Sequence, residues 1–198
     1  MSHPFCPRCG SEDTREYLYG YPPRQYDKEK YVLGGDVLWA TNPLYFCVNC
    51  EKHFGLMAAE GHKPHHHSQY TIKWISFKEK SKEGSMEISF MEEGIEAKVI
   101  LPPQKAYEDF YTLGREEWLH IRLQVVNELF LLDWEEDPAI LVESEDVEWE
   151  LCIGFVDDTN SKLQGDGRVP HYYSAFKEWL KPYIDRGIHR NGEVLDCK

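Results

Sequence analysis

Two short stretches of the chain share one spacing, Cys6-Pro7-Arg8-Cys9-Gly10 and Cys47-Val48-Asn49-Cys50. Two residues between a pair of cysteines let both thiolates of a tight turn reach the same ion, and two such turns supply the four sulfur ligands of a closed tetrahedral site. This donor set is typical of structural zinc. The spacing therefore predicts one structural Zn2+ held by four metal ligands, Cys6, Cys9, Cys47 and Cys50.

The residues around these cysteines resemble a zinc ribbon of the kind found in many small bacterial proteins. The matching residues are Cys6-Pro7-Arg8-Cys9-Gly10-Ser11, Gly34-Gly35, Pro43, Tyr45-Phe46-Cys47-Val48-Asn49-Cys50 and Phe54-Gly55. The resemblance covers residues 1–57 and implies that each cysteine pair lies at the tip of a β-hairpin, with the four cysteines as metal ligands. Glu51 stands where such ribbons usually have glycine.

The segment between the two cysteine pairs is rich in aromatic residues, namely Tyr17, Tyr19, Tyr21, Tyr26, Tyr31, Trp39 and Tyr45. Two interpretations of these rings remain open. They can pack a small core for a ribbon that zinc alone does not hold, or they can form an exposed contact surface of the kind that interfaces favour. His53, three residues after Cys50, either replaces a thiolate or covers the rim of the site.

Residues 58–69 are polar, contain Gly61 and Pro64, and are predicted to be a linker. The linker holds a histidine-rich tract, His62, His65, His66 and His67. Such tracts can bind metal weakly. A second, low-affinity metal site is therefore an alternative to a simple exposed linker.

Residues 70–198 hold most of the apolar residues and are predicted to form an acidic α+β domain, an antiparallel sheet with two helices. Alternating apolar residues or β-favouring composition indicate strands near residues 70–78, 86–90, 95–101 and 147–155. One helix is expected at residues 114–132, whose apolar residues cover a wide arc. A second helix is expected to begin near Pro170, with Pro182 weakening its final turn.

The clearest strand is centred on Trp149, which is predicted to be buried while Glu148 and Glu150 face water. Turns are expected at Asp157-Asp158-Thr159-Asn160 and at Gly165-Asp166-Gly167. Residues 105–185 also faintly resemble the C-terminal part of uncharacterised bacterial α+β proteins. The matching features are Glu148-Trp149-Glu150-Leu151, the turn Gly167-Arg168-Val169-Pro170 and a final aromatic helix. This second resemblance implies a fold and no activity.

The chain carries a formal net charge of −13, which is unevenly distributed. Residues 1–60 contain 6 Lys+Arg against 8 Asp+Glu, and residues 61–198 contain 16 against 27. Such an acidic surface repels phosphate backbones and disfavours nucleic-acid binding. The sequence has no apolar run near the roughly 20 residues that span a bilayer, and it begins without signal-peptide features. We therefore expect a cytoplasmic protein whose paired cysteines bind metal instead of forming disulfides.

The remaining reactive side chains are interpreted as surface residues. Carboxylates are concentrated at residues 135–137 and 143–150, where a solvated acidic face is favoured over a buried acid–base pair. Cys152 lies beside Glu148 and Glu150, and negative neighbours raise a thiol pKa, which argues against a nucleophile. Cys197 is expected to be exposed.

These observations favour a zinc-binding adaptor that works through contact with a partner protein, whose basic surface would suit the acidic domain. One alternative is an enzyme with a non-zinc site between the ribbon and the α+β domain, because four cysteines close the coordination shell of the zinc itself. A second alternative is nucleic-acid binding through the ribbon, which is only mildly acidic. No catalytic residue is predicted.

Overall fold

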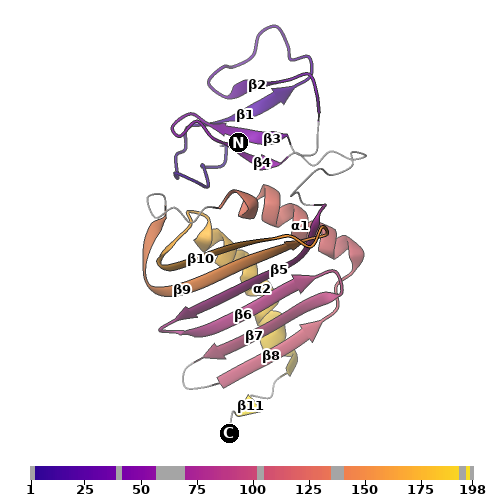
Figure 1. Cartoon of the computed structure of the whole chain (residues 1–198), viewed down its shortest axis with the longest axis vertical. Helices are drawn as coiled ribbons and strands as arrows, with labels where there is room; N and C mark the ends of the chain where they lie inside the picture. The colour runs from indigo at the N-terminus through magenta and orange to yellow at the C-terminus, as the bar shows by residue number, and fades with distance from the viewer. Residues whose placement is uncertain are drawn as a thin grey trace.

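The computed structural model describes residues 3–38, 42–56, 70–101, 105–134, 141–191 and 195–196. These residues form two β-sheets and two α-helices, so the predicted α+β class is confirmed in this broad sense. In Figure 1 a small N-terminal sheet stands at one end of an elongated molecule, and a large sheet with a helix behind it makes up the rest. The predicted linker and its histidine tract lie outside the described residues.

The small sheet has the order β2-β1-β3-β4. Its strands are β1 (Thr14–Tyr19), β2 (Tyr31–Gly35), β3 (Pro43–Cys47) and β4 (His53–Leu56). Strands β3 and β4 form an antiparallel hairpin whose tip carries Cys47 and Cys50, as the ribbon resemblance implies. The first cysteine pair instead lies in a turn before β1, because the described residues 3–13 contain no strand.

The large sheet has seven strands, and every neighbouring pair is antiparallel. In spatial order these are β10 (Asn160–Val169), β9 (Val142–Phe155), β5 (Ile72–Ser81), β6 (Gly84–Met91), β7 (Gly94–Leu101), β8 (Lys105–Tyr111) and β11 (Leu195–Asp196). The four strands expected from the sequence are confirmed as β5, β6, β7 and β9, and β9 begins earlier than expected. Strands β8, β10 and β11 were not predicted.

The turn expected at Gly165-Asp166-Gly167 is wrong, because these residues lie inside β10. Strand β10 pairs with β9 along its length, and the register shifts between Asp166 and Arg168. Gly167 adopts a φ of +64° at this shift. One class of β-bulge contains a residue in this left-handed conformation, which glycine reaches without steric cost. The glycines therefore mark a bulge, whereas the turn expected at residues 157–160 is confirmed between β9 and β10.

The first helix is shorter than expected. Helix α1 spans Arg115–Asn127 instead of residues 114–132, and a short 3-10 turn, η1, follows at Leu131–Asp133. The helix ends at Asn127, and three residues later Phe130 adopts a left-handed conformation, with φ of +53°. Leu129, Phe130 and Leu131 are nevertheless buried. The apolar residues after Asn127 therefore belong to the hydrophobic core, although they are not helical.

Helix α2 (Tyr173–Asn191) covers one face of the large sheet (Figure 1). It begins after the expected start near Pro170, and Pro182 lies in its interior. Phe176 meets Phe77 of β5 edge to face, with ring centroids 4.9 Å apart, and Trp179 packs on Phe90 of β6 at 5.3 Å. Aromatic pairs of this kind stabilise a core beyond the area that they bury.

The burial of Trp149 is confirmed. Its side chain is 3% exposed, and its indole N–H donates a hydrogen bond to the carbonyl oxygen of Arg168 at 2.7 Å. This bond satisfies the only polar group of the ring, which would otherwise be costly to bury. Glu148 is exposed on the opposite side of β9, as period-two alternation requires.

Candidate metal centre

The four predicted cysteines converge on one point. Their sulfur atoms all lie within 4.8 Å of one another, and among the residues that the structure describes they form the one cluster of at least three such donors. The Sγ atoms of Cys6 and Cys50 are 3.7 Å apart, and those of Cys9 and Cys47 are 3.6 Å apart. Four thiolates at about 2.3 Å from a zinc ion in tetrahedral geometry would be separated by about 3.8 Å. The cluster therefore fits a single metal ion.

Both cysteine turns are built in the same way. The amide of Cys6 donates to the carbonyl of Ser11 at 2.9 Å, and the amide of Cys47 donates to the carbonyl of Lys52 at 2.9 Å. Four residues after each first cysteine the backbone enters the left-handed region, with φ of +70° at Gly10 and +56° at Glu51. In the second turn, Glu51 thus adopts the left-handed conformation that favours glycine. A residue with a Cβ atom adopts this conformation at a steric cost.

The protein environment affects the four thiols differently. Burial raises the pKa of Cys6 far above its ordinary value and also raises the pKa of Cys50. Partial burial raises the pKa of Cys9 as well, but the backbone N–H of Ser11 and the amide of Asn49 outweigh it and lower that pKa to about 7. The Asn49 Nδ2 atom lies 3.6 Å from Cys9 Sγ. A donor that favours the thiolate also favours metal ligation, since the thiolate is the ligand.

Asn49 is a residue of the site that the sequence reasoning missed. It occupies one of the two positions between Cys47 and Cys50, and its amide reaches across to the other cysteine pair. A polar residue inside the second turn was the available signal. Hydrogen bonds from such partners to the ligands tune metal sites in general.

His53 does not join the four-sulfur cluster. Its Nδ1 atom lies 2.7 Å from the hydroxyl of Tyr17, and its side chain is exposed. His53 and Cys6 both line a small hollow of about 150 Å3 beside the cluster. This position corresponds to the rim of the site and not to a ligand.

Cys152 and the acidic residues of 143–150 form no second cluster of metal donors in the part of the chain that the structure describes. Cys152 lies on the helix-free side of β9, and burial together with the neighbouring Glu150 raises its pKa. The acidic residues 143–150 are part of β9. Residues 135–137, the histidine tract and Cys197 lie outside the described residues.

Some aromatic residues of the insert pack in a core, and others are exposed, so each of the two interpretations holds for part of the set. Tyr45 packs on Phe54 and Phe130, with ring centroids 5.3 and 6.2 Å away, and so belongs to a core. Tyr17 contacts Tyr19 on the other face of the small sheet, at 5.7 Å. Tyr21 is 97% exposed. Trp39 lies outside the described residues.

Comparison of the chain with protein-family models, with curated proteins and with solved structures finds no match. The likeness to a zinc ribbon therefore rests on the geometry of the four-cysteine cluster, which is compatible with a site of that type. The resemblance of residues 105–185 to bacterial α+β proteins has no such geometric support. Among the described residues, no helix has the length and apolar character that crossing a membrane requires.

Proposed function

We propose that this protein is a protein-interaction module, an adaptor, that is folded around one structural zinc ion and docks a partner protein through the insert of its ribbon. The observation that carries this proposal is a concentration of exposed apolar side chains between the two cysteine pairs. Four of the large hydrophobic residues that are exposed in the described structure fall in this one segment, Tyr21, Leu33, Val37 and Leu38.

The zinc is assigned a structural role because of its donor set. Four thiolates complete a tetrahedral shell and leave no open position for water or substrate, in contrast to catalytic zinc sites. Cys6 and Cys47 are 1% and 0% exposed. A closed, buried site of this kind stabilises the small sheet, whose strands are too short to bury a large core by themselves.

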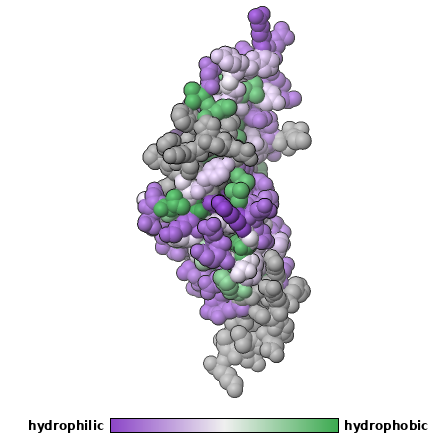
Figure 2. Space-filling view, turned by 90° about the vertical axis from the view of Figure 1, so that its right-hand side faces the viewer, coloured by the Kyte–Doolittle hydropathy of each residue, from purple (hydrophilic) through white to green (hydrophobic). Residues whose placement is uncertain are grey.

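Two of the exposed apolar residues, Leu33 and Val37, line a hollow of about 430 Å3 together with Tyr17 and Tyr19. Figure 2 shows hydrophobic side chains in the upper part of the molecule, where the small sheet lies, and others further down. An exposed apolar surface with aromatic rings at a concave site is typical of protein contacts. We define the insert surface as Tyr21, Leu33, Val37 and Leu38 with this hollow.

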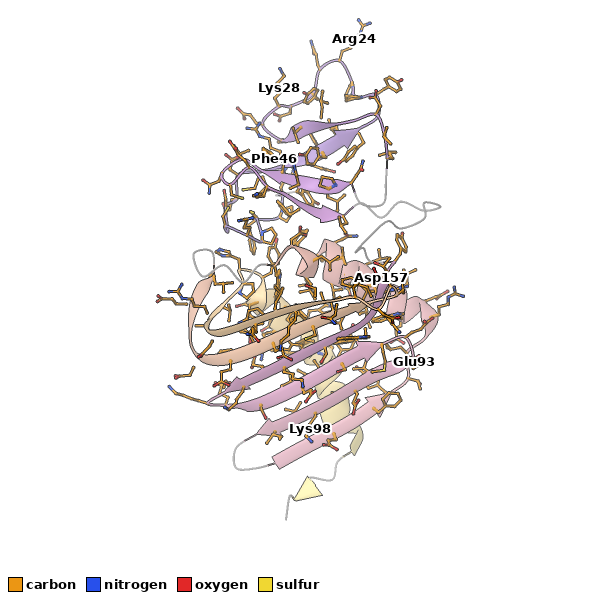
Figure 3. All side chains as sticks on the ribbon, viewed as in Figure 1. Arg24, Lys28, Phe46, Glu93, Lys98 and Asp157 are labelled. Carbon is orange, nitrogen blue, oxygen red and sulfur yellow. The ribbon has the colours of Figure 1, made fainter. Side chains whose placement is uncertain are left out.

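The helix-free face of the large sheet is chemically different. One row across five strands alternates in charge, Glu150, Lys78, Glu87, Lys98 and Glu108. Lys78 pairs with Glu87 at 3.0 Å, and Lys98 pairs with Glu108 at 2.5 Å. Figure 3 shows Lys98 on this open face and Phe46 on the small sheet. Lys162 pairs with Glu150 at 2.6 Å, so each of the three glutamates in the row has a lysine partner. A partner protein would gain little on this face for the cost of desolvating these charges.

The two alternative functions gain less support. The hollow between the cysteine cluster and η1 is about 150 Å3, well below the roughly 300 Å3 or more of ordinary ligand pockets. An enzyme site between the ribbon and the large sheet is therefore not favoured. Nucleic-acid binding would require a basic surface, whereas residues 1–60 carry 6 Lys+Arg against 8 Asp+Glu.

A photo-crosslinking experiment tests the docking proposal. A benzophenone amino acid placed at Val37 in cells that express the protein naturally should give one discrete crosslinked species, and the same probe at Lys98 should not. Leu33→Asp should abolish the Val37 crosslink, because a charge in the insert surface would be desolvated on docking.

The matched control is Val156→Asp, which changes an equally exposed valine in the turn after β9. It should leave the crosslink at Val37 intact. Zinc content and melting temperature should be unchanged in both aspartate variants, so that a lost crosslink cannot be ascribed to unfolding. Equal crosslinking from Val37 and Lys98, or a crosslink that survives Leu33→Asp, would contradict the proposal.

A further inference from the structure

The two cysteine turns face the α+β body. Phe5, immediately before Cys6, stacks on Tyr172 at the start of α2, with ring centroids 4.1 Å apart. The hydroxyl of Tyr172 donates a hydrogen bond to the carbonyl oxygen of Phe5 at 3.0 Å. Gly10 lies against His171 so closely that a Cβ atom there would be 2.6 Å from the imidazole Cε1. The first cysteine turn is therefore packed directly on the residues that lead into α2.

Strand β4, which follows the second cysteine turn, is packed on the segment after α1. The amide of Gly55 donates a hydrogen bond to Asp133 Oδ2 at 3.0 Å. Phe54 meets Phe130 edge to face at 5.2 Å, and Phe130 meets Tyr172 in the same manner at 5.1 Å. Phe130 thus lies between the aromatic rings of the ribbon and the start of α2. We call Phe5, Phe54, Phe130, Asp133 and Tyr172 the joint.

The conformation of Phe130 indicates that the joint holds it in place. A bulky residue in the left-handed region is uncommon and persists only where its surroundings over-determine it. Here the surroundings are rings from both sides, including Tyr45 and Phe54 of the ribbon. Gly55 contributes room, because a Cβ atom at that position would lie 3.1 Å from Phe130 Cε1. Removal of the ribbon would therefore take away the contacts that fix this backbone.

We propose that the zinc centre also couples the ribbon to the α+β body, so that metal binding orders the joint and, reciprocally, the joint strengthens metal binding. This inference rests on the structural zinc proposed above. It adds that Phe5 and Gly55 are positioned by the two cysteine turns and act on α2 and η1 across the joint. Through this coupling the state of the metal site affects the order of η1 and of the start of α2.

The coupling is expected because neither the ribbon nor the α+β body contains all of the packing contacts of the joint. Without metal, no ion links the four sulfurs that lie within 4.8 Å of one another, and small structural zinc modules usually lose their fold. The turns would then no longer hold Phe5 and Gly55 against the body. By linkage, any interaction that favours the metal-bound arrangement must raise the metal affinity by the same factor.

Reciprocity supplies the test, because it predicts a change in metal affinity from residues that are not ligands. Phe130→Ala and Tyr172→Ala in the full-length chain should raise the zinc dissociation constant by roughly tenfold, within the 5- to 150-fold range of such couplings. The constant is measured by competition with a chromophoric chelator. The matched control is Phe90→Ala, which removes a buried phenyl group that packs on Trp179 and Tyr183, away from the joint. It should change the constant by less than about twofold.

A milder variant covers the case in which the alanine substitutions prevent folding. Tyr172→Phe deletes only the hydroxyl that bonds to Phe5, and the loss of one net hydrogen bond predicts a two- to tenfold weaker zinc affinity. Hydrogen exchange gives the converse measurement in the wild-type protein. Removing zinc with a chelator should deprotect amides at residues 129–133 and 172–176, while residues 86–90 stay protected.

Two results would overturn the coupling. One is a zinc affinity in the joint variants equal to that of Phe90→Ala. The other is unchanged protection at residues 172–176 after metal removal. Metal analysis of the wild-type protein comes first, so that an absence of zinc, which would defeat the zinc proposal itself, is distinguished from zinc that is bound but uncoupled.

Discussion

The ring of Phe5 stacks on the ring of Tyr172, and the Tyr172 hydroxyl donates a hydrogen bond to the Phe5 carbonyl oxygen. The two residues are 167 positions apart. One precedes the first cysteine of the metal centre, and the other precedes the helix that fills the core of the large sheet. This contact joins the cysteine cluster to the hydrophobic core. The mutations below can therefore be followed both in the small sheet and in the large sheet.

Zinc should be present at one ion per chain. The four sulfurs are already spaced for a tetrahedral site, and X-ray absorption should show a single shell of sulfur atoms at about 2.3 Å. Metal analysis of protein purified without a histidine tag checks the stoichiometry. A metal content near zero, or a shell that includes oxygen, would show that the cluster does not hold a closed zinc site.

Cys47→Ser should unfold the small sheet, because it removes a buried ligand from a unit that needs its metal to fold. Amides of β1, β3 and β4 should lose protection in hydrogen exchange, together with those of the joint, while β5 and β6 remain protected. Cys152→Ser is the control, since Cys152 lies on the helix-free side of β9 and outside the cluster. Protection lost evenly along the whole chain would mean that the large sheet does not fold without the ribbon.

Trp149→Ala should destabilise the protein by about 3–5 kcal/mol, because it empties a buried site and leaves the Arg168 carbonyl without its donor. That loss is a large part of the roughly 5–15 kcal/mol of a typical domain. Glu148→Ala, at the adjacent exposed position, should change the free energy of unfolding by less than about 0.5 kcal/mol. Urea unfolding measures both values. A nearly silent Trp149→Ala would be incompatible with the packing of β9 described above.

Glu51→Gly should stabilise the metal-bound ribbon. Glu51 adopts a φ of +56°, and a residue with a Cβ pays roughly 1–2 kcal/mol for a left-handed conformation that glycine adopts freely. We expect a gain of about 1 kcal/mol, read as a higher melting temperature of the zinc-loaded protein.

Gly10→Ala is the matched substitution in the first cysteine turn, and its effect on the melting temperature should be opposite to that of Glu51→Gly. It introduces a Cβ atom at a φ of +70° and against the ring of His171, so it should lower the melting temperature. Glu12→Gly, at an exposed glutamate without positive φ, serves as the control. It should slightly lower the melting temperature, because glycine gives the unfolded chain more conformational freedom. Equal effects of Glu51→Gly and Glu12→Gly would argue that the second turn is unstrained.

The sequence by itself determined which four cysteines come together and which side of β9 faces inward. Both follow from short-range geometry. Two residues between cysteines suit a tight turn whose two sulfurs reach one ion, and period-two alternation places Trp149 and Glu148 on opposite faces. Strands β6 and β7 could be predicted from the same alternation, and β5 from its β-favouring composition.

Tertiary structure decided what local pattern leaves undetermined. Gly165 and Gly167 have turn-forming composition, yet pairing with β9 draws them into a strand, since strand formation depends on cross-strand neighbours more than on intrinsic preference. Leu129 and Phe130 extend the apolar pattern of α1, yet burial against the ribbon holds Phe130 outside the helix. The joint could not be predicted from any local sequence pattern. Its residues are far apart in the chain, and only the tertiary fold brings them into contact.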